Sequence, residues 1–249
     1  MQNPEQEWFG QKHVTAEEKT SLVRGVFDSV APKYDLMNDL MSAGLHRKWK
    51  NHFVRLIRPR ANMKCLDVAG GTGDIAFRLR KKAGPGIDIT VFDLNKEMLS
   101  VGRGRAIDRG WLKDFEWITG NAESLPFPDN SFDLYTIAFG LRNVTRIDTA
   151  LKEAYRVLKP GGRFFCMEFS RVQDPFLARL YDAYSYNVIP KIGQAVTKDR
   201  DSYQYLVESI RKFPSQKELI RRLGAAGFSS SSFSNLNFGV VAIHQGLKV

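Results

Sequence analysis

The chain has 249 residues, of which 43% are hydrophobic and 26% charged, and its formal net charge is +10. A chain of this length can form one large domain or two small ones, with a core of its own. The composition is that of an ordinary globular protein, which excludes collagen-like, coiled-coil and wholly disordered chains.

The cysteines, histidines and hydropathy indicate whether disulfides, metal sites or membrane spans are expected. Cys65 and Cys166 stand far apart inside apolar runs, which excludes a disulfide framework or a zinc cluster and favours a reducing compartment. The four histidines are scattered without ligand spacing, so we expect no metal. No apolar run is long enough for a membrane span, and the chain does not begin with a targeting pattern. We therefore expect any membrane contact to be peripheral.

The N-terminal flank, residues 1–60, has a mostly helical pattern and ends in a strongly basic stretch. Residues 40–66 include seven basic residues and no acidic one. Apolar residues recur in this stretch at helical spacing: Trp49, Phe53 and Leu56 or Ile57. This pattern predicts an amphipathic basic helix, which can lie on an anionic membrane surface or be an ordinary surface helix with a solvated basic side. Since no nucleic-acid recognition motif accompanies the charge, we expect no nucleic-acid partner.

Residues 61–170 alternate short apolar runs with helical patterns. The runs predict strands over 64–69, 88–94, 115–119, 132–139 and 163–169, the first of them buried. The helices are predicted over 74–82, around Met98, Leu99 and Ala106, and through Ala150, Ala154, Val157 and Leu158. This alternation predicts an α/β domain with a doubly wound, Rossmann-like parallel sheet. The turn 159–162 (KPGG) is expected to end the last of these helices and lead into the fifth strand.

The remaining residues form an insertion after the fifth strand (171–213) and a C-terminal part (214–249). The insertion holds five of the eight tyrosines, Tyr181, Tyr184, Tyr186, Tyr203 and Tyr205. We predict that it forms an aromatic cover over a substrate site, with core packing and a dimer contact as the alternatives for its tyrosines. Ser215 stands three residues before Glu218, the spacing of a capping box, and Gly227 is the predicted end of that helix. Two strands, 229–236 and 240–244, follow it, and the whole chain is interpreted as one domain.

A glycine loop between the first predicted strand and its helix is the first functional signal. Residues 69–74 (AGGTGD) permit a tight turn at which a ligand can approach bare backbone and the N-terminus of a helix. From Gly71 the sequence also satisfies G-x-G-x-x-G/A, which fits a dinucleotide site. Asp93 ends the second strand, where a carboxylate can accept hydrogen bonds from the ribose hydroxyls of a bound adenosine.

The loop after the third strand distinguishes between cofactors. Residues 120–127 (GNAESLPF) precede a strand that begins with Phe132 and Asp133. Together with Asp67, the glycine loop and Asp93, this layout resembles the class I S-adenosylmethionine methyltransferases over about residues 64–170. The resemblance implies S-adenosyl-L-methionine as cofactor, bound by Asp67, Gly70, Gly71, Thr72, Gly73, Asp93, Asn121 and Ala122.

Three further stretches resemble the UbiE family of quinone-biosynthesis C-methyltransferases: 26–39 (VFDSVAPKYDLMND), 139–144 (FGLRNV) and 201–210 (DSYQYLVESI). The resemblance implies methylation of a ring carbon of 2-methoxy-6-polyprenyl-1,4-benzoquinol in ubiquinone biosynthesis, or of demethylmenaquinol. It also implies a homodimer, a peripheral membrane position and other quinone-biosynthesis proteins as partners. The ending 239–249 is similar to mitochondrial ubiquinone methylases, which implies the matrix side of the mitochondrial inner membrane, or the cytoplasm of a bacterium.

Methyl transfer from a sulfonium requires that the ring carbon be positioned, that water be excluded and that the ring be electron-rich. Arg142 lies just past the fourth strand, and a positive charge about 4 Å from a phenolate favours it by about 4 kcal/mol at an effective dielectric near 20. Arg142 is therefore the expected electrostatic stabiliser, with a water beside Arg142 and Asn143 carrying the proton away. Tyr34 is assigned to a lid over substrate or cofactor, with core packing as the alternative. His46 is an alternative base, although Arg47 and Lys48 beside it favour a surface position.

Two other functions stay open at this point. The hypothesis of a nicotinamide-dependent oxidoreductase is based on the glycine loop alone. Titration with S-adenosylmethionine and with NADH distinguishes it from a methyltransferase. A non-catalytic quinone-binding or lipid-binding scaffold is indicated by the basic helix and the aromatic insertion, and it predicts liposome binding without turnover.

Overall fold

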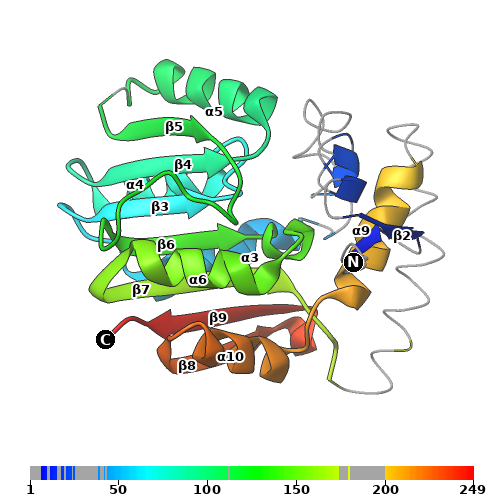
Figure 1. Cartoon of the computed structure of the whole chain (residues 1–249). Coiled ribbons are helices and arrows are strands. Elements are labelled where there is room, and N and C mark those ends of the chain that lie inside the picture. The colour runs from blue at the N-terminus through cyan, green and yellow to red at the C-terminus, as the bar shows by residue number, and fades with distance from the viewer. Residues whose placement is uncertain are drawn as a thin grey trace.

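The computed structural model describes residues 44–111, 113–173 and 200–249, together with the short pieces 7–9, 12–15, 18–19, 21–23, 25, 39, 42 and 179. Its centre is a seven-stranded sheet in the order β5-β4-β3-β6-β7-β9-β8 (Figure 1). The strands are β3 (Lys64–Val68), β4 (Asp88–Asp93), β5 (Phe115–Thr119), β6 (Phe132–Ala138), β7 (Leu158–Phe169), β8 (Ser229–Leu236) and β9 (Val241–Leu247). Strands β3 to β7 are parallel, and β9 is antiparallel to both β7 and β8.

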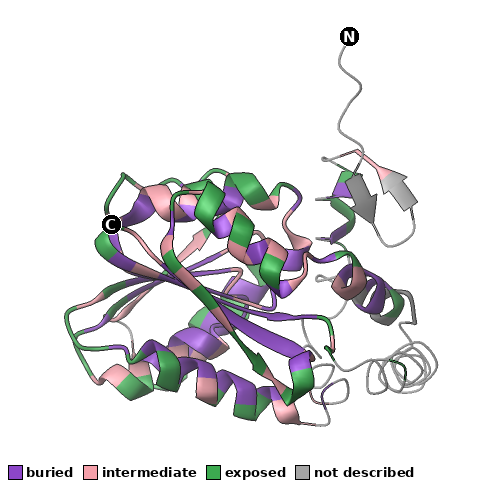
Figure 2. Cartoon of the chain, turned by 90° about the horizontal axis from the view of Figure 1, so that it is seen from below, coloured by how far each residue is buried: buried purple, intermediate pink, exposed green. Residues whose placement is uncertain are grey.

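Helices cover both faces of this sheet. Helices α3 (Leu45–Ile57), α4 (Asp74–Ala83) and α5 (Lys96–Asp108) contribute to one apolar cluster. Helices α6 (Ile147–Val157) and α10 (Gln216–Ala225) contribute to the other. In Figure 2 the buried strands run between these two layers, whose outer sides are exposed. Helix α9 (Arg200–Lys212) lies beyond the edge at which the parallel strands end and contacts the short 3-10 helix η2 (Leu141–Asn143) (Figure 1).

Burial on both faces explains why the strands were recognisable in the sequence. In β3, Cys65 belongs to the cluster under α3 to α5, and its neighbour Leu66 belongs to the cluster under α6 and α10. A parallel strand with helices on both faces therefore reads as a continuous apolar run. All five predicted strands and the helices between them are present, so the predicted α/β alternation is confirmed.

Three details differ from the sequence-based expectations. The KPGG stretch is not a turn that precedes the strand: β7 already begins at Leu158, which pairs with Phe132, and a bulge interrupts the pairing before Arg163. The two C-terminal strands make the sheet mixed rather than parallel. The flank is not wholly helical, because β1 (Glu7–Phe9) and β2 (Lys12–Val14) form an antiparallel hairpin.

Helix α10 begins as predicted. The Ser215 hydroxyl accepts a hydrogen bond from the backbone N–H of Glu218 at 3.3 Å, which satisfies one of the donors left over at a helix N-terminus. Gly227 follows the helix with φ +108°, a conformation that favours glycine. In the insertion before it, Tyr181, Tyr184 and Tyr186 lie outside the described residues, whereas Tyr205 is buried in α9.

The apolar face of α3 is buried, which corrects the membrane interpretation of this helix. Trp49, Phe53 and Ile57 are at most 4% exposed and pack in the cluster on the sheet. The Trp49 indole N–H donates to the Asn237 side-chain oxygen at 2.7 Å. A membrane can therefore meet only the basic side of α3, because its apolar side is already covered.

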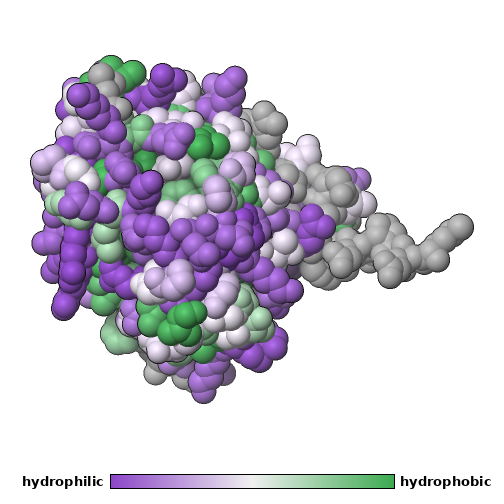
Figure 3. All heavy atoms as spheres, turned by 60° about the vertical axis from the view of Figure 1, so that its left-hand side comes forward, coloured by the Kyte–Doolittle hydropathy of each residue, from purple (hydrophilic) through white to green (hydrophobic). Residues whose placement is uncertain are grey.

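Within the described part of the chain, the helices are too short or too polar to cross a bilayer. Figure 3 shows the face to the left of Figure 1, where hydrophilic side chains dominate and hydrophobic groups are small and scattered. Cys65 and Cys166 are free and buried, and burial raises the pKa of both thiols.

Candidate active site

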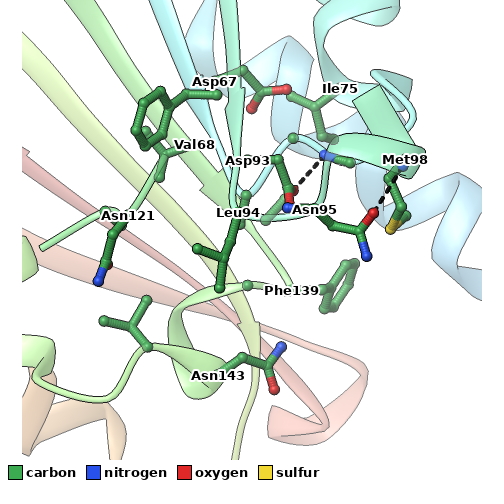
Figure 4. A pocket seen from close by; sticks show the side chains of 18 of the residues that line it. Asp67, Val68, Ile75, Asp93, Leu94, Asn95, Met98, Asn121, Phe139 and Asn143 are labelled. Atoms are coloured by element: carbon green, nitrogen blue, oxygen red, sulfur yellow. Dashed lines mark hydrogen bonds between the residues drawn. The ribbon is translucent and has the colours of Figure 1, made fainter. Parts of the chain in front are cut away.

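A cavity lies at the edge of the sheet where β3, β4, β5 and β6 end. The chain runs outward from β3 through β4 to β5, then returns to place β6 on the other side of β3. The connections at this switch point diverge to opposite faces of the sheet and leave a crevice, the usual ligand site of open α/β folds. Each loop at this edge contributes residues to the cavity, and Figure 4 shows Asp93, Asn121 and Asn143 around it.

The glycine loop forms one wall of the cavity. Gly71 has φ +52°, and a Cβ at Gly70 would meet a Val91 methyl at 2.6 Å, so larger residues do not fit without a shift. All the predicted cofactor-binding residues line the cavity except Gly73. Gly73 has φ +81°, precedes α4, and would bring a Cβ to 2.7 Å from the Trp117 ring. Its place in the structure is to let the loop turn into the helix.

Asp93 holds the loops around it in place. One carboxylate oxygen accepts from the Gly71 N–H at 2.8 Å, and the other accepts from the Asn95 N–H at 2.8 Å. Asn95 in turn caps α5 by accepting from the Met98 N–H at 2.9 Å, and Figure 4 marks this bond and the one from Gly71 to Asp93. Burial raises the pKa of Asp93, and the hydrogen bonds from Asn95 and Gly71 oppose this shift. Each carboxylate oxygen retains acceptor capacity for a ligand hydroxyl.

Asp67 supplies a second acid beneath the glycine loop. Its Oδ1 accepts from the Thr136 hydroxyl at 2.7 Å, whereas Oδ2 is buried and has no hydrogen-bond partner within the described residues. Burial raises the pKa of Asp67 to about 7, and the hydrogen bond from Thr136 partly opposes the shift. A buried carboxylate with an open oxygen suits a ligand group that is a cation and a hydrogen-bond donor.

The loop after β5 forms the far wall. Asn121 accepts the Glu123 N–H at 3.0 Å, which fixes the turn that carries Ala122. Glu123 pairs with Arg146 at 2.7 Å. Phe92 and Leu94 add apolar surface to the same cavity. A flat, neutral heterocycle such as adenine fits this wall, and a hydroxylated ribose fits Asp93 beside it.

Arg142 and Asn143, neighbours in η2, occupy different environments. Asn143 lines the cavity, and its side-chain oxygen accepts from the Tyr205 hydroxyl at 3.2 Å. Arg142 does not line it: the guanidinium is only 4% exposed and donates to Glu168 at 2.7 Å and to the Phe139 carbonyl at 2.5 Å. Glu168 is fully buried and also accepts the Arg142 backbone N–H at 3.3 Å. The positive charge of Arg142 is therefore paired, which reduces the field that it exerts on a ligand.

The remaining predicted site residues are placed as follows. Tyr34 and Asp35 lie outside the described residues. His46 is buried rather than on the surface, and its Nε2 lies 2.8 Å from Asp39. Burial lowers the pKa of His46, although the hydrogen bond with Asp39 opposes the shift.

Three charged residues in the wall of the cavity, Lys50, Asp74 and Glu123, were not among the predicted site residues. The Lys50 ammonium donates to the Asp74 carboxylate at 2.8 Å. Lys50 is four residues from both His46 and Val54, so it lies on the buried side of α3. This helical spacing could have indicated a buried lysine, but Lys50 stands in a run of basic residues and was interpreted as one more exposed charge.

Solved structures confirm the predicted class I methyltransferase fold. A SAM-dependent methyltransferase from Aquifex aeolicus matches with a TM-score of 0.59 at 19% identity, over 80% of this chain and 89% of that one. A SAM-dependent methyltransferase from Thermotoga maritima, described as a possible histamine N-methyltransferase, matches with a TM-score of 0.65 at 21% identity, over 91% of this chain and all of that one.

Sequence relatives define the family. A protein of Dinoroseobacter shibae named ubiquinone/menaquinone biosynthesis C-methyltransferase UbiE is 55% identical over 241 residues, 97% of this chain and 96% of the relative. A protein of the same name from Brucella abortus is 54% identical over 97% of this chain and 90% of the relative. Residues 12–248 match the ubiE/COQ5 methyltransferase family, and the chain belongs to that family.

Proposed function

We propose that this S-adenosylmethionine-dependent methyltransferase methylates a ring carbon of a polyprenyl quinol, 2-methoxy-6-polyprenyl-1,4-benzoquinol, in ubiquinone biosynthesis. The observation that carries the proposal is 54–55% identity, over nearly the full chain, to proteins named for ubiquinone/menaquinone biosynthesis C-methylation. Demethylmenaquinol is the second candidate substrate, because the same names include menaquinone. The cavity fits the cofactor for three reasons. Asp67 is a buried carboxylate with one oxygen available to a ligand. The glycine loop lets a ligand approach the backbone, and the Asp93 carboxylate can accept hydrogen bonds from the ribose.

The bound cofactor supplies an electrophilic methyl group on a sulfonium. The residues of this chain then have three tasks. Asp93 and the loop of Asn121 and Ala122 hold the adenosine end, and Asp67 holds the ammonium of the methionyl end. With the cofactor held by these residues, the quinol would be bound beside Asn143, which lines the same cavity, and its ring carbon would have to be in line with the sulfonium–methyl bond. Holding two reactants in this way contributes roughly 7 to 11 kcal/mol in well-oriented systems.

Asn143 is the proposed contact for a quinol oxygen, since it lines the cavity and is held by Tyr205. Arg142 remains the proposed electrostatic stabiliser of the phenolate, although the Glu168 carboxylate partly offsets the field of its guanidinium. The pair also fixes the η2 turn, because Glu168 accepts the Arg142 backbone N–H. A water beside this turn is the proposed carrier of the proton. Tyr34 is the proposed lid residue.

The proposed partners are the polyprenyl quinol, a peripheral membrane surface, other quinone-biosynthesis proteins and a second copy of the chain. The exposed basic residues of α3, Arg47, Lys48 and Arg55, support contact with an anionic surface. The two relatives named above are bacterial, which supports the cytoplasmic alternative over the mitochondrial inner membrane.

A substrate comparison tests the proposed function. The protein is incubated with S-adenosylmethionine and a short-chain methoxy prenyl benzoquinol or a short-chain demethylnaphthoquinol, and kcat/KM is measured for each. We expect turnover of the benzoquinol to dominate. If turnover of the naphthoquinol dominates, the protein acts in menaquinone synthesis instead. Liposome binding without turnover of either quinol would favour a non-catalytic scaffold.

Cofactor affinity is expected to depend on pH through Asp67. Burial, with a smaller contribution from the neighbouring Asp93 and Asp74 carboxylates, raises its pKa to about 7 in the free protein, and the ligand ammonium favours the ionised carboxylate. The affinity for S-adenosylhomocysteine should therefore fall by up to about tenfold per pH unit below about pH 7 and level off above it. Calorimetric titration from acid to neutral pH measures this, and Asp67→Asn should flatten the profile. An unchanged slope in that variant would assign the titration to another group.

A further inference from the structure

The cofactor cavity is acidic, with one exception. Among the described residues that line it, four are carboxylic acids, Asp67, Asp74, Asp93 and Glu123, and Lys50 is the single cationic side chain. S-adenosylmethionine carries two positive charges, on its sulfonium and its ammonium, and one negative charge, on its carboxylate. An acidic cavity suits the two cations, and the lone carboxylate requires a cationic or N–H donor partner.

Lys50 is held in place by charge pairing. Its side chain is only 6% exposed, and its ammonium donates to Asp74 at 2.8 Å. Within the described residues this is its one hydrogen bond, whereas an ammonium has three N–H donors. Asp74 also accepts from Arg78 at 2.9 Å, so two cations share one carboxylate and the group has a net positive charge. A lysine is seldom buried without a partner for its donors.

The position of Lys50 matches the methionyl end of the cofactor. Asp74 directly follows Gly73 as the first residue of α4, so the ammonium of Lys50 lies at the glycine-loop end of the cavity. Asn121 and Ala122 lie after β5, at the opposite end. With the adenosine bound on the side of Asp93 and Asn121, as proposed above, the amino-acid part of the cofactor would extend towards Lys50. The N-terminus of α4 adds a further favourable field for an anion there.

We propose that the ammonium of Lys50 binds the carboxylate of the methionyl part of S-adenosylmethionine. Asp74, which Arg78 holds from its other carboxylate oxygen, fixes that ammonium in position, while Asp67 takes the amino group of the ligand. Helix α3, which lies outside the strand and helix repeats of the sheet, thereby completes the cofactor site. The inference rests on the proposed function only through the identity of the cofactor and is independent of the quinol.

Two ligands that differ in the amino-acid part test the proposal. S-adenosylhomocysteine carries the carboxylate, and 5′-methylthioadenosine has the same adenosine and sulfur without it. In a Lys50→Met variant, the dissociation constant of S-adenosylhomocysteine should rise roughly 10- to 100-fold, the range for a lost charge-assisted hydrogen bond. That of 5′-methylthioadenosine should stay within about twofold. Titration calorimetry on the full chain gives both values.

Lys48→Met is the matched control, because Lys48 lies on the exposed side of the same helix. It should leave both dissociation constants near those of the original protein. If Lys50→Met does not fold, Lys50→Gln, which keeps most of the length of the side chain, replaces it. Equal loss for the two ligands would reduce Lys50 to a packing role, and no loss for either would also overturn the proposal. Failure of both ligands to bind the unaltered protein would instead refute the cofactor assignment.

Discussion

Removal of the Glu168 carboxylate, in a Glu168→Ala variant, lowers the free energy of unfolding by about 3 to 5 kcal/mol. Glu168 is fully buried and accepts hydrogen bonds from the Arg142 guanidinium at 2.7 Å and from the Phe169 N–H at 2.8 Å. Without it, the Arg142 guanidinium, 4% exposed, becomes an unpaired buried charge. Urea unfolding, followed by circular dichroism, measures the change.

A double variant separates this pairing from catalysis. Arg142→Met with Glu168→Met removes both charges, and we expect much of the lost stability to return, because a well-packed apolar pair often replaces a buried ion pair without loss. An Arg142→Ala variant alone destabilises the chain and also removes the proposed stabiliser, so its low activity is not informative. The stable double variant should bind the cofactor as before but turn over slowly. Full turnover in that variant would exclude a catalytic role for Arg142.

Replacement of Asp93 by alanine reduces the affinity for S-adenosylhomocysteine by roughly 100-fold. The carboxylate joins the Gly71 and Asn95 N–H groups, each at 2.8 Å, and is the proposed acceptor for the ribose. Hydrogen bonds to a charged group contribute about 1.5 to 3 kcal/mol each, and about 1.4 kcal/mol corresponds to a factor of ten in affinity.

Asp88→Ala is the control for this experiment, because Asp88 is exposed at the opposite end of the same strand. Titration calorimetry on the two variants gives the comparison. A loss of less than about threefold for Asp93→Ala would show that the ribose lies elsewhere.

The parts of the fold that could be predicted are those encoded by local pattern. The strands were recognisable because residues such as Cys65 and Leu66 are buried on opposite faces of the sheet. The glycine loop and Asp93 were recognisable because a turn between a strand and a helix admits few residue types. The hairpin of β1 and β2 was missed because strands of three residues leave almost no periodic signal.

The parts of the site that could not be predicted depend on contacts between distant residues. Arg142 and Glu168 form an ion pair although they are 26 residues apart in the sequence, and the residues around each of them do not indicate the other as its partner. Lys50 meets Asp74 across 24 positions, between a helix of the flank and a helix of the sheet. In both cases the sequence identifies a charged residue, but its ion-pair partner is known only from the tertiary structure. The partner decides how strong the electrostatic field of that residue is at a ligand.

The position of the transferred methyl group tests the central claim most directly. The protein is incubated with S-adenosylmethionine labelled isotopically in its methyl group and with the short-chain methoxy prenyl benzoquinol, and the product is examined by nuclear magnetic resonance. We expect one labelled methyl group bonded to a ring carbon, together with one equivalent of S-adenosylhomocysteine. A label on a ring oxygen, or an unlabelled product, would contradict carbon methylation of a quinol by this protein.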